Sequence, residues 1–228
     1  MPKPKTMIIL MALLIVSGLS FITYQFDRGT QEKVYDEAEA PGGAKVTRGL
    51  EPEADAEAVV LEVESGGFSY GRIVLELYPN IAPKMVERFK RLVREGFYDG
   101  TAFHRINPRA GVVQGGDPNS KDEDPANDGL GGSPYEDLPA EFSDIPFDRG
   151  IVGAARGDVN TANSQFYITL HRVPQWDAQY TAFGKVIDGM GNVDAIAGAP
   201  TRPAPYGESP AEKIVIKRAT LQPRSNFK

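Results

Sequence analysis

The sequence predicts a mainly β protein, a closed β-barrel capped by helices and preceded by one N-terminal transmembrane helix. Three observations predict it. Many short segments rich in β-branched and aromatic residues are separated by turns, for which the chain has 24 glycines and 18 prolines. Only two segments of the globular part space their apolar residues as a helix does. One uncharged apolar run near the N-terminus is long enough to cross a bilayer.

The N-terminal apolar run comprises residues 7–26, MIILMALLIVSGLSFITYQF. As a helix, a run of this length spans about 30 Å, which is the thickness of the hydrocarbon core of a membrane. Lys3 and Lys5 precede the run, and positive charge favours the cytoplasmic side, so we expect residues 1–6 there. The alternative is a cleaved signal peptide, although residues 17–20 (SGLS) offer only a weak cleavage site inside the run. We therefore expect a single-pass anchor in the cell membrane, with the domain on the extracytoplasmic side (periplasm or exterior).

Residues 27–57 differ from the rest of the chain in composition, because acidic residues, Pro and Gly are frequent and apolar residues are sparse. Such a segment cannot bury enough apolar surface to offset the entropy lost on ordering. We interpret it as a flexible acidic linker. It would hold a globular domain, residues 58–222, away from the membrane, and residues 223–228 would form a C-terminal tail.

The composition excludes several classes of site. The chain has no cysteine, which excludes disulfides, thiolate nucleophiles and Cys-ligated metals. Its two histidines, His104 and His171, are too few for a histidine-rich metal site. The formal net charge of −6 provides no basic footprint for nucleic acid. We expect no metal, no cofactor and no nucleic-acid partner, and we expect a monomer.

The globular part begins with a hairpin and a helix. Residues 58–63 and 71–77 have strand patterns and are separated by a Ser-Gly-Gly turn. Residues 81–96 follow with helical spacing, with Pro83 suited to the first turn and Gly96 to the end.

The remainder of the globular part is predicted as short strands, one polar loop and a second helix. The strand-like segments are residues 103–106, 112–114, 150–154, 165–170, 181–186 and 213–221. The polar loop covers residues 121–139 and the short helix residues 188–197. Many short strands with two helices favour a closed barrel capped by helices.

Four segments of the chain resemble the cyclophilin family. They are residues 98–106 (YDGTAFHRI), residues 112–118 (VVQGGDP), residues 150–168 with GIVGAAR and NSQFYI, and residues 181–190 (TAFGKVIDGM). In this order and spacing they are specific together, and the resemblance covers about residues 58–221. It implies an eight-stranded antiparallel barrel with a helix at each end. It also implies a peptidyl-prolyl cis-trans isomerase that acts on proline-containing polypeptides during protein folding.

The reaction implied by this resemblance needs neither a nucleophile nor a metal. An X-Pro bond isomerises slowly because amide resonance raises the barrier to about 18–20 kcal/mol. A hydrogen-bond donor aimed at the prolyl nitrogen stabilises the twisted state more than the planar one. A guanidinium suits this role because it stays charged and presents a rigid fork of donors. The resemblance implies that Arg105, directly after Phe103-His104, is the catalytic residue.

The resemblance also implies which residues bind the substrate. Gln114 matches the glutamine that holds the substrate backbone, and Tyr167 matches an aromatic residue of the proline pocket. Val112 takes an apolar position in that pocket. Trp176 matches a further apolar position, usually leucine, and Tyr180 replaces a rim histidine, as in many bacterial members.

Three consecutive residues, Ala155, Arg156 and Gly157, match the positions that meet the peptide through backbone groups. The side chain of Arg156 is a departure, because the family commonly has asparagine there. A backbone contact is compatible with that change.

One departure motivates a second hypothesis. Gly111 stands where the family usually has an aromatic residue three positions before the glutamine, and the segment from Arg105 to Gln114 is one residue longer than usual. A proline-peptide binding module or chaperone with little turnover is therefore the alternative to an active isomerase. The presence of Arg105 and Gln114 favours the isomerase.

A hydrolase is disfavoured, because no G-x-S-x-G motif surrounds Ser164.

Overall fold

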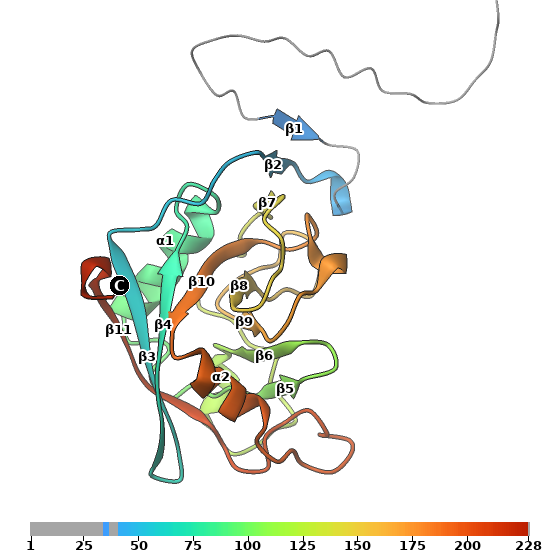
Figure 1. Ribbon diagram of the computed structural model, residues 1–228. Coiled ribbons are helices and arrows are strands. Elements are labelled where there is room, and N and C mark those ends of the chain that lie inside the picture. Colours follow the sequence, from blue (N-terminus) through green and yellow to red (C-terminus); the bar gives the residue numbers. More distant parts are fainter. Residues whose placement is uncertain (1–33, 37–40, 228) are drawn as a thin grey trace, which may run out of the picture. The chain divides into compact units, whose positions relative to one another are not determined.

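The computed structural model describes residues 34–36 and 41–227. Eight strands of this part form one antiparallel sheet in the order β11-β3-β4-β10-β8-β9-β6-β5. Their bounds are β3 Glu57–Ser65, β4 Phe68–Leu77, β5 Arg105–Asn107, β6 Val112–Gly115, β8 Ile151–Ala154, β9 Phe166–Thr169, β10 Ala182–Asp188 and β11 Val215–Pro223. Two α-helices, α1 (Pro83–Arg94) and α2 (Met190–Ala197), lie at different ends of the curled sheet (Figure 1).

The other elements are short. A small sheet contains β1 (Val34–Asp36), β2 (Val46–Arg48) and β7 (Phe142–Ser143). Four 3-10 turns complete the described elements: Pro41–Gly43, Pro118–Lys121, Pro174–Trp176 and Arg224–Asn226.

The large sheet curls into a half-barrel. Its eight antiparallel strands confirm the mainly β prediction, but the edge strands β5 and β11 are not paired with each other in the part of the chain that the structure describes. Single backbone bonds cross this gap instead, from the Gly100 N–H to the Ile216 carbonyl and from the Phe103 N–H to the Ile214 carbonyl, both at 2.8 Å. The predicted closed ring of strands is therefore found as a curled sheet, because the segment before β5 is too irregular to form a ladder with β11.

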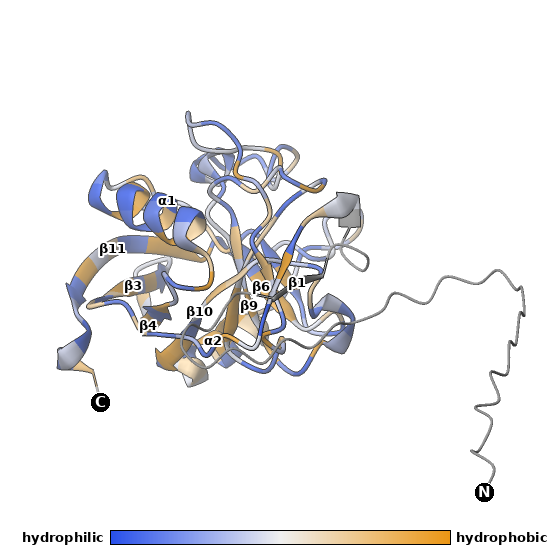
Figure 2. Ribbon diagram, turned by 90° about the horizontal axis from the view of Figure 1, so that it is seen from above, coloured by the Kyte–Doolittle hydropathy of each residue, from blue (hydrophilic) through white to orange (hydrophobic). Residues whose placement is uncertain are grey.

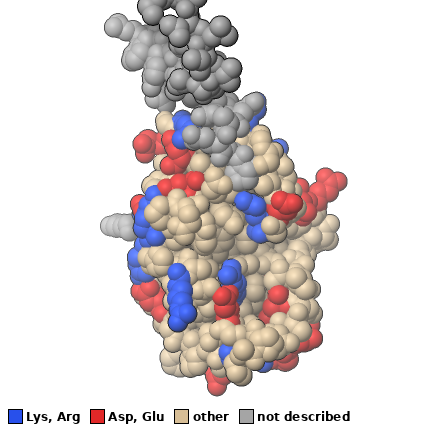
Figure 3. Space-filling model, turned by 90° about the vertical axis from the view of Figure 1, so that its right-hand side faces the viewer, with Lys and Arg blue, Asp and Glu red and all other residues tan. Residues whose placement is uncertain are grey.

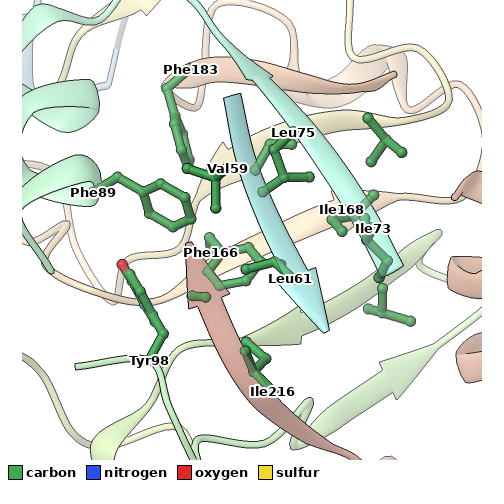
Figure 4. Packing of buried hydrophobic residues seen from close by; sticks show 14 of the residues in the cluster. Val59, Leu61, Ile73, Leu75, Phe89, Tyr98, Phe166, Ile168, Phe183 and Ile216 are labelled. Carbon is green, nitrogen blue, oxygen red and sulfur yellow. The ribbon is translucent and has the colours of Figure 1, made fainter. Parts of the chain in front are cut away.

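The core lies inside the curl, where α1 packs against the sheet. The buried face of α1 presents Phe89, whose ring centroid lies 4.9 Å from that of Tyr98, 5.3 Å from Phe166 and 5.1 Å from Phe183 (Figure 4). Figure 2 shows hydrophilic colour along the other side of this helix. The amphipathic spacing read from the sequence therefore corresponds to a helix with one buried stripe.

Both ends of α1 have identifiable causes. Pro83 occupies the first turn, and the neighbouring N–H groups of Lys84 and Met85 donate to the two carboxylate oxygens of Glu141 at 3.0 and 2.9 Å. This carboxylate satisfies donors that a helix start leaves unpaired, while burial raises its pKa. At the other end Gly96 adopts φ +68°, a conformation that glycine reaches without steric cost. The predicted helix is confirmed within two residues at each end.

The structure also describes part of residues 27–57, predicted as a flexible linker. Strand β2 pairs in parallel with β7, and Val46 is fully buried. The Asp55 N–H donates to the Leu77 carbonyl at 2.9 Å, and its carboxylate binds Lys90 Nζ at 2.7 Å. This described part contacts the domain, whereas the domain boundary at residue 58 stays a prediction that truncation can test.

The predicted anchor, residues 7–26, lies outside the described residues. Over residues 34–36 and 41–227, the structure has no helix with the length and apolar character needed to cross a membrane.

Candidate active site

Strand register brings three of the predicted site residues together. Arg105 on β5 lies directly opposite Gln114 on β6, and Gln114 lies directly opposite Tyr167 on β9. Direct partners on neighbouring antiparallel strands point to the same face, with Cβ atoms about 4.5–5.5 Å apart. The three side chains therefore form a row across the sheet.

A pocket of about 90 Å³ opens over this row. Eight of the nine predicted site residues line it: Arg105, Val112, Gln114, Ala155, Arg156, Tyr167, Trp176 and Tyr180. The ninth, Gly157, lines an adjoining pocket of about 410 Å³, which shares Gln114, Ala155 and Arg156 with the first. Residues from strands β5, β6 and β9, the loop after β8 and the loop after β9 thus surround one pocket.

Aromatic rings form the apolar side of the pocket. The Tyr167 ring lies 5.1 Å from Trp176 and 5.9 Å from Tyr180, between ring centroids. Phe147 packs behind them, with its centroid 6.2 Å from Tyr167. Sequence reasoning missed Phe147, because it stands in an irregular segment without a motif. Since aromatic rings combine a large apolar face with few rotamers, this wall is suited to a flat apolar ring.

The position of Tyr167 depends on a glycine in the neighbouring strand. Gly153 is its direct partner on β8, and a Cβ atom at Gly153 would lie 2.3 Å from Tyr167 Cζ. The tyrosine ring therefore occupies the space above Gly153. Burial raises the pKa of the Tyr167 phenol well above its ordinary value, so the phenol stays neutral at physiological pH.

The polar side of the pocket is a directional chain of hydrogen bonds. Arg105 Nη1 donates to Gln114 Oε1 at 3.3 Å, and Gln114 Nε2 donates to Gln165 Oε1 at 2.9 Å. Gln165 Nε2 in turn donates to the carbonyls of Gly129 and Gly131, at 2.9 and 2.8 Å. Each amide is thus held in one orientation. Gln165 belongs to the NSQFYI segment, but it was not among the residues predicted to form the site.

A carboxylate that sequence reasoning missed holds the other side of the arginine. Arg105 Nε donates to Glu208 Oε2 at 2.5 Å. The side chain of Arg105 is 41% exposed, so the guanidinium remains accessible at the edge of the pocket.

Comparison with known proteins bears directly on this pocket. A sequence model of the family described as "Cyclophilin type peptidyl-prolyl cis-trans isomerase/CLD" matches residues 59–221. The chain belongs to this family. Its isomerase domain is therefore a cyclophilin domain, and the pocket lies within the matched residues.

Individual proteins similar to this chain also carry names of peptidyl-prolyl cis-trans isomerases. A "Probable peptidyl-prolyl cis-trans isomerase" of Brucella suis is 45% identical over 160 residues, which cover 68% of this chain and 77% of the relative. The "Peptidyl-prolyl cis-trans isomerase-like 1" of Gibberella zeae is 37% identical over 155 residues, 66% of this chain and 89% of the relative. A crystal structure of a Cryptosporidium parvum cyclophilin in the presence of the dipeptide Ala-Pro has a TM-score of 0.62 and 29% identity, and covers 72% of this chain and 98% of that one.

Two departures from the cyclophilin pattern have structural explanations. Arg156, where asparagine is common, donates from Nη2 to the Gln179 carbonyl at 2.9 Å and stacks 4.5 Å from the Tyr180 ring centroid. Its side chain therefore forms part of the pocket rim. Gly111 adopts φ +83°, and a Cβ atom there would lie 2.7 Å from His171 Cε1. The imidazole thus covers the position where the family usually has an aromatic residue.

The titratable groups near the pocket do not form a catalytic acid-base pair. Burial lowers the pKa of His104, which keeps its ring neutral at pH 7. Burial, together with the charges of Asp117 and Asp122, raises the pKa of Asp128 to about 6. Within the described ranges, no group of three metal-ligating side chains gathers. On the face drawn in Figure 3, basic and acidic side chains are interspersed around an uncharged area, so neither sign dominates there.

Proposed function

We propose that this cyclophilin isomerises X-Pro bonds in polypeptides held at the pocket around Arg105, and that it assists the folding of exported proteins. One observation carries the proposal: an arginine and a glutamine, hydrogen-bonded to each other, face an aromatic wall across a single pocket. The relative crystallised in the presence of Ala-Pro supports a proline-containing substrate.

In this proposal the apolar side of the pocket binds the proline ring and the polar side binds the peptide backbone. The proline ring packs against Val112, Tyr167 and Trp176, which remove it from water. Gln114 binds the peptide backbone, and the backbone of Ala155 to Gly157 binds the adjoining part of the chain. With the ring fixed, the carbonyl before proline is the part that rotates.

Arg105 supplies the stabilisation specific to the transition state. When the amide twists, resonance is lost and the prolyl nitrogen gains a lone pair that accepts a hydrogen bond. A guanidinium donor directed at this nitrogen stabilises the twisted state and does little for the planar substrate. No bond other than the rotating one changes, so the reaction needs no proton transfer.

The proposal is tested with the full chain, solubilised in detergent, in a protease-coupled assay on a proline-containing peptide. Acceleration above the uncatalysed rate is the expected result. The second candidate, a proline-peptide binding module, is motivated by Gly111. It predicts binding of the same peptide, measured by calorimetry, without acceleration, and that outcome would replace the isomerase proposal.

We further propose that residues 7–26 anchor the enzyme in the cell membrane, with the cyclophilin domain on the extracytoplasmic side. The uncharged run and the preceding Lys3 and Lys5 support this. The chain should sediment with membranes, and protease added to the outer side should remove the domain. Recovery of a soluble protein that begins near residues 20–30 would favour a cleaved signal peptide instead.

A further inference from the structure

The connection between α2 and β11 contains a loop that lies beside β5. Its base is closed by a bridge between Thr201 and Pro210, and by a bond from the Arg202 N–H to the Ser209 carbonyl at 2.8 Å. In Figure 1 this loop is the orange-red segment next to β5. The Ile106 N–H donates to the Glu208 carbonyl at 2.7 Å, so the backbone of the loop is joined to the edge of β5.

The side chain of Glu208 spans two residues of that strand. Its Oε2 accepts from Arg105 Nε at 2.5 Å, and its Oε1 accepts from Asn107 Nδ2. Residues two apart on a strand point to the same face. One carboxylate can therefore bind both side chains at once, and each of its oxygens has a fixed partner.

The consequence for Arg105 is geometric. Its guanidinium is planar, with five N–H donors in a rigid fork. Glu208 holds the Nε end, and Gln114 Oε1 accepts from Nη1 at 3.3 Å. Two anchors on different nitrogens define the orientation of the plane and leave three donors for a substrate. Without them, a side chain that is 41% exposed would sample several rotamers.

We propose that Glu208 is a positioning residue of the isomerase, which orients the Arg105 guanidinium toward the prolyl nitrogen. The inference rests on the proposed role of Arg105. Because Glu208 acts through the arginine, its loss should lower kcat while KM stays nearly constant. Glu208 also lines a groove of about 780 Å³ next to the pocket, so direct contact with substrate is the competing explanation. That explanation predicts a change in KM.

The test compares Glu208→Ala and Glu208→Gln with the wild type in the isomerase assay. We expect Glu208→Ala to lower kcat by about 10- to 100-fold, because a catalytic group displaced by about 1 Å can cost about 10²-fold, with KM changed by less than about twofold. The kcat of Glu208→Gln should lie between those of Glu208→Ala and the wild type. Its amide oxygen can still accept from Arg105 Nε, but its amide nitrogen cannot accept from Asn107. The matched control is Glu212→Gln, an exposed glutamate just after the loop, which should leave both constants unchanged.

A double-mutant cycle separates positioning from a general structural effect. In an Arg105→Ala background, adding Glu208→Ala should change kcat by less than about twofold, because the group that it positions is already gone. An equal loss in both backgrounds would overturn the inference. Unchanged kcat in the single variants, or a rise in KM alone, would overturn it as well.

An independent measurement does not depend on turnover. In nitrogen-15 NMR spectra, the Arg105 Nε–H signal should be protected from exchange with water in the wild type and lose that protection in Glu208→Ala. A wild-type signal without protection would refute the pairing itself. A wild type that shows the protected signal but no isomerase activity would instead refute the proposed function, and the catalytic role of Glu208 would fall with it.

Discussion

In the variant Arg105→Ala, the twisted substrate loses a hydrogen-bond donor while the planar substrate loses little. Removing one preorganised transition-state donor costs about 10²–10³-fold, or about 2.7–4 kcal/mol. We therefore expect kcat/KM to fall by at least about 10²-fold. The fold should persist, because the ion pair that is lost joins side chains that are 41% and 48% exposed. Such a pair stabilises by about 0–1 kcal/mol.

The assay compares wild type and variant at equal concentrations of folded protein, verified by circular dichroism and thermal unfolding. Arg105→Lys should also be slow, because an ammonium cannot donate along both directions that Glu208 and Gln114 fix. Gln114→Ala should cost less than Arg105→Ala, since the glutamine positions the peptide. The matched control is Arg109→Ala, an exposed arginine in the turn after β5, which should keep the wild-type rate.

Two results would refute this reasoning. Equal rates for wild type and Arg105→Ala would mean that Arg105 is not the catalytic residue, or that the wild type itself does not turn over. A rate that varies steeply between about pH 6 and 9 would indicate a titrating group, whereas a guanidinium stays charged throughout that range. The nearby His104 should contribute little near neutral pH, because burial lowers its pKa and favours the neutral ring.

Three further predictions concern stability, measured by urea denaturation. The pKa of Asp128 is raised from 3.8 to about 6, so the folded state binds this proton more tightly than the unfolded state and stability falls as pH rises across that interval. Asp128→Asn should therefore raise the free energy of unfolding by about 1 kcal/mol at pH 7, a value already reduced for solvent screening. At pH 3 the substitution should leave the free energy of unfolding unchanged. An equal gain at both pH values would contradict this reasoning. Phe89→Ala should cost about 3–5 kcal/mol, because Phe89 is fully buried among three aromatic rings, and an unchanged midpoint would contradict the packing described. A chain that starts at Glu57 should keep its activity but be about 2 kcal/mol less stable than one that starts at Lys45, because it loses buried Val46 and the pair of Asp55 with Lys90; equal stability would show that residues 45–56 behave as a linker.

Local patterns in the sequence were sufficient for the main elements. The apolar spacing of residues 81–96 predicted α1, because the helix buries one face. Strand-like composition on either side of a Ser-Gly-Gly turn predicted the hairpin of β3 and β4, in which successive residues of both strands are buried. The motif resemblance placed Arg105, Gln114 and the aromatic wall, and strand register brings them together.

The features that the sequence did not reveal depend on contacts between distant segments. Glu208 reaches Arg105 across 103 positions, from a loop with no periodic pattern. Strand β2 is held by β7, and Val46 alone among polar neighbours carries no periodic signal of burial. Closure of the barrel likewise depends on how the segment before β5 meets β11. In each case the partner segment, rather than the local residues, decides the structure.

The contact between Gly153 and Tyr167 restricts which substitutions these two positions can accept during evolution. A methyl group at position 153 would overlap the tyrosine ring at 2.3 Å, so alanine there displaces a wall of the substrate pocket. Removing the ring first would leave a void beside Phe147 and Trp176, which pack against it. We therefore expect each single change to disturb the pocket, and a combined change to be tolerated better. While Tyr167 is present, we therefore expect only glycine to fit at position 153 without displacing the ring.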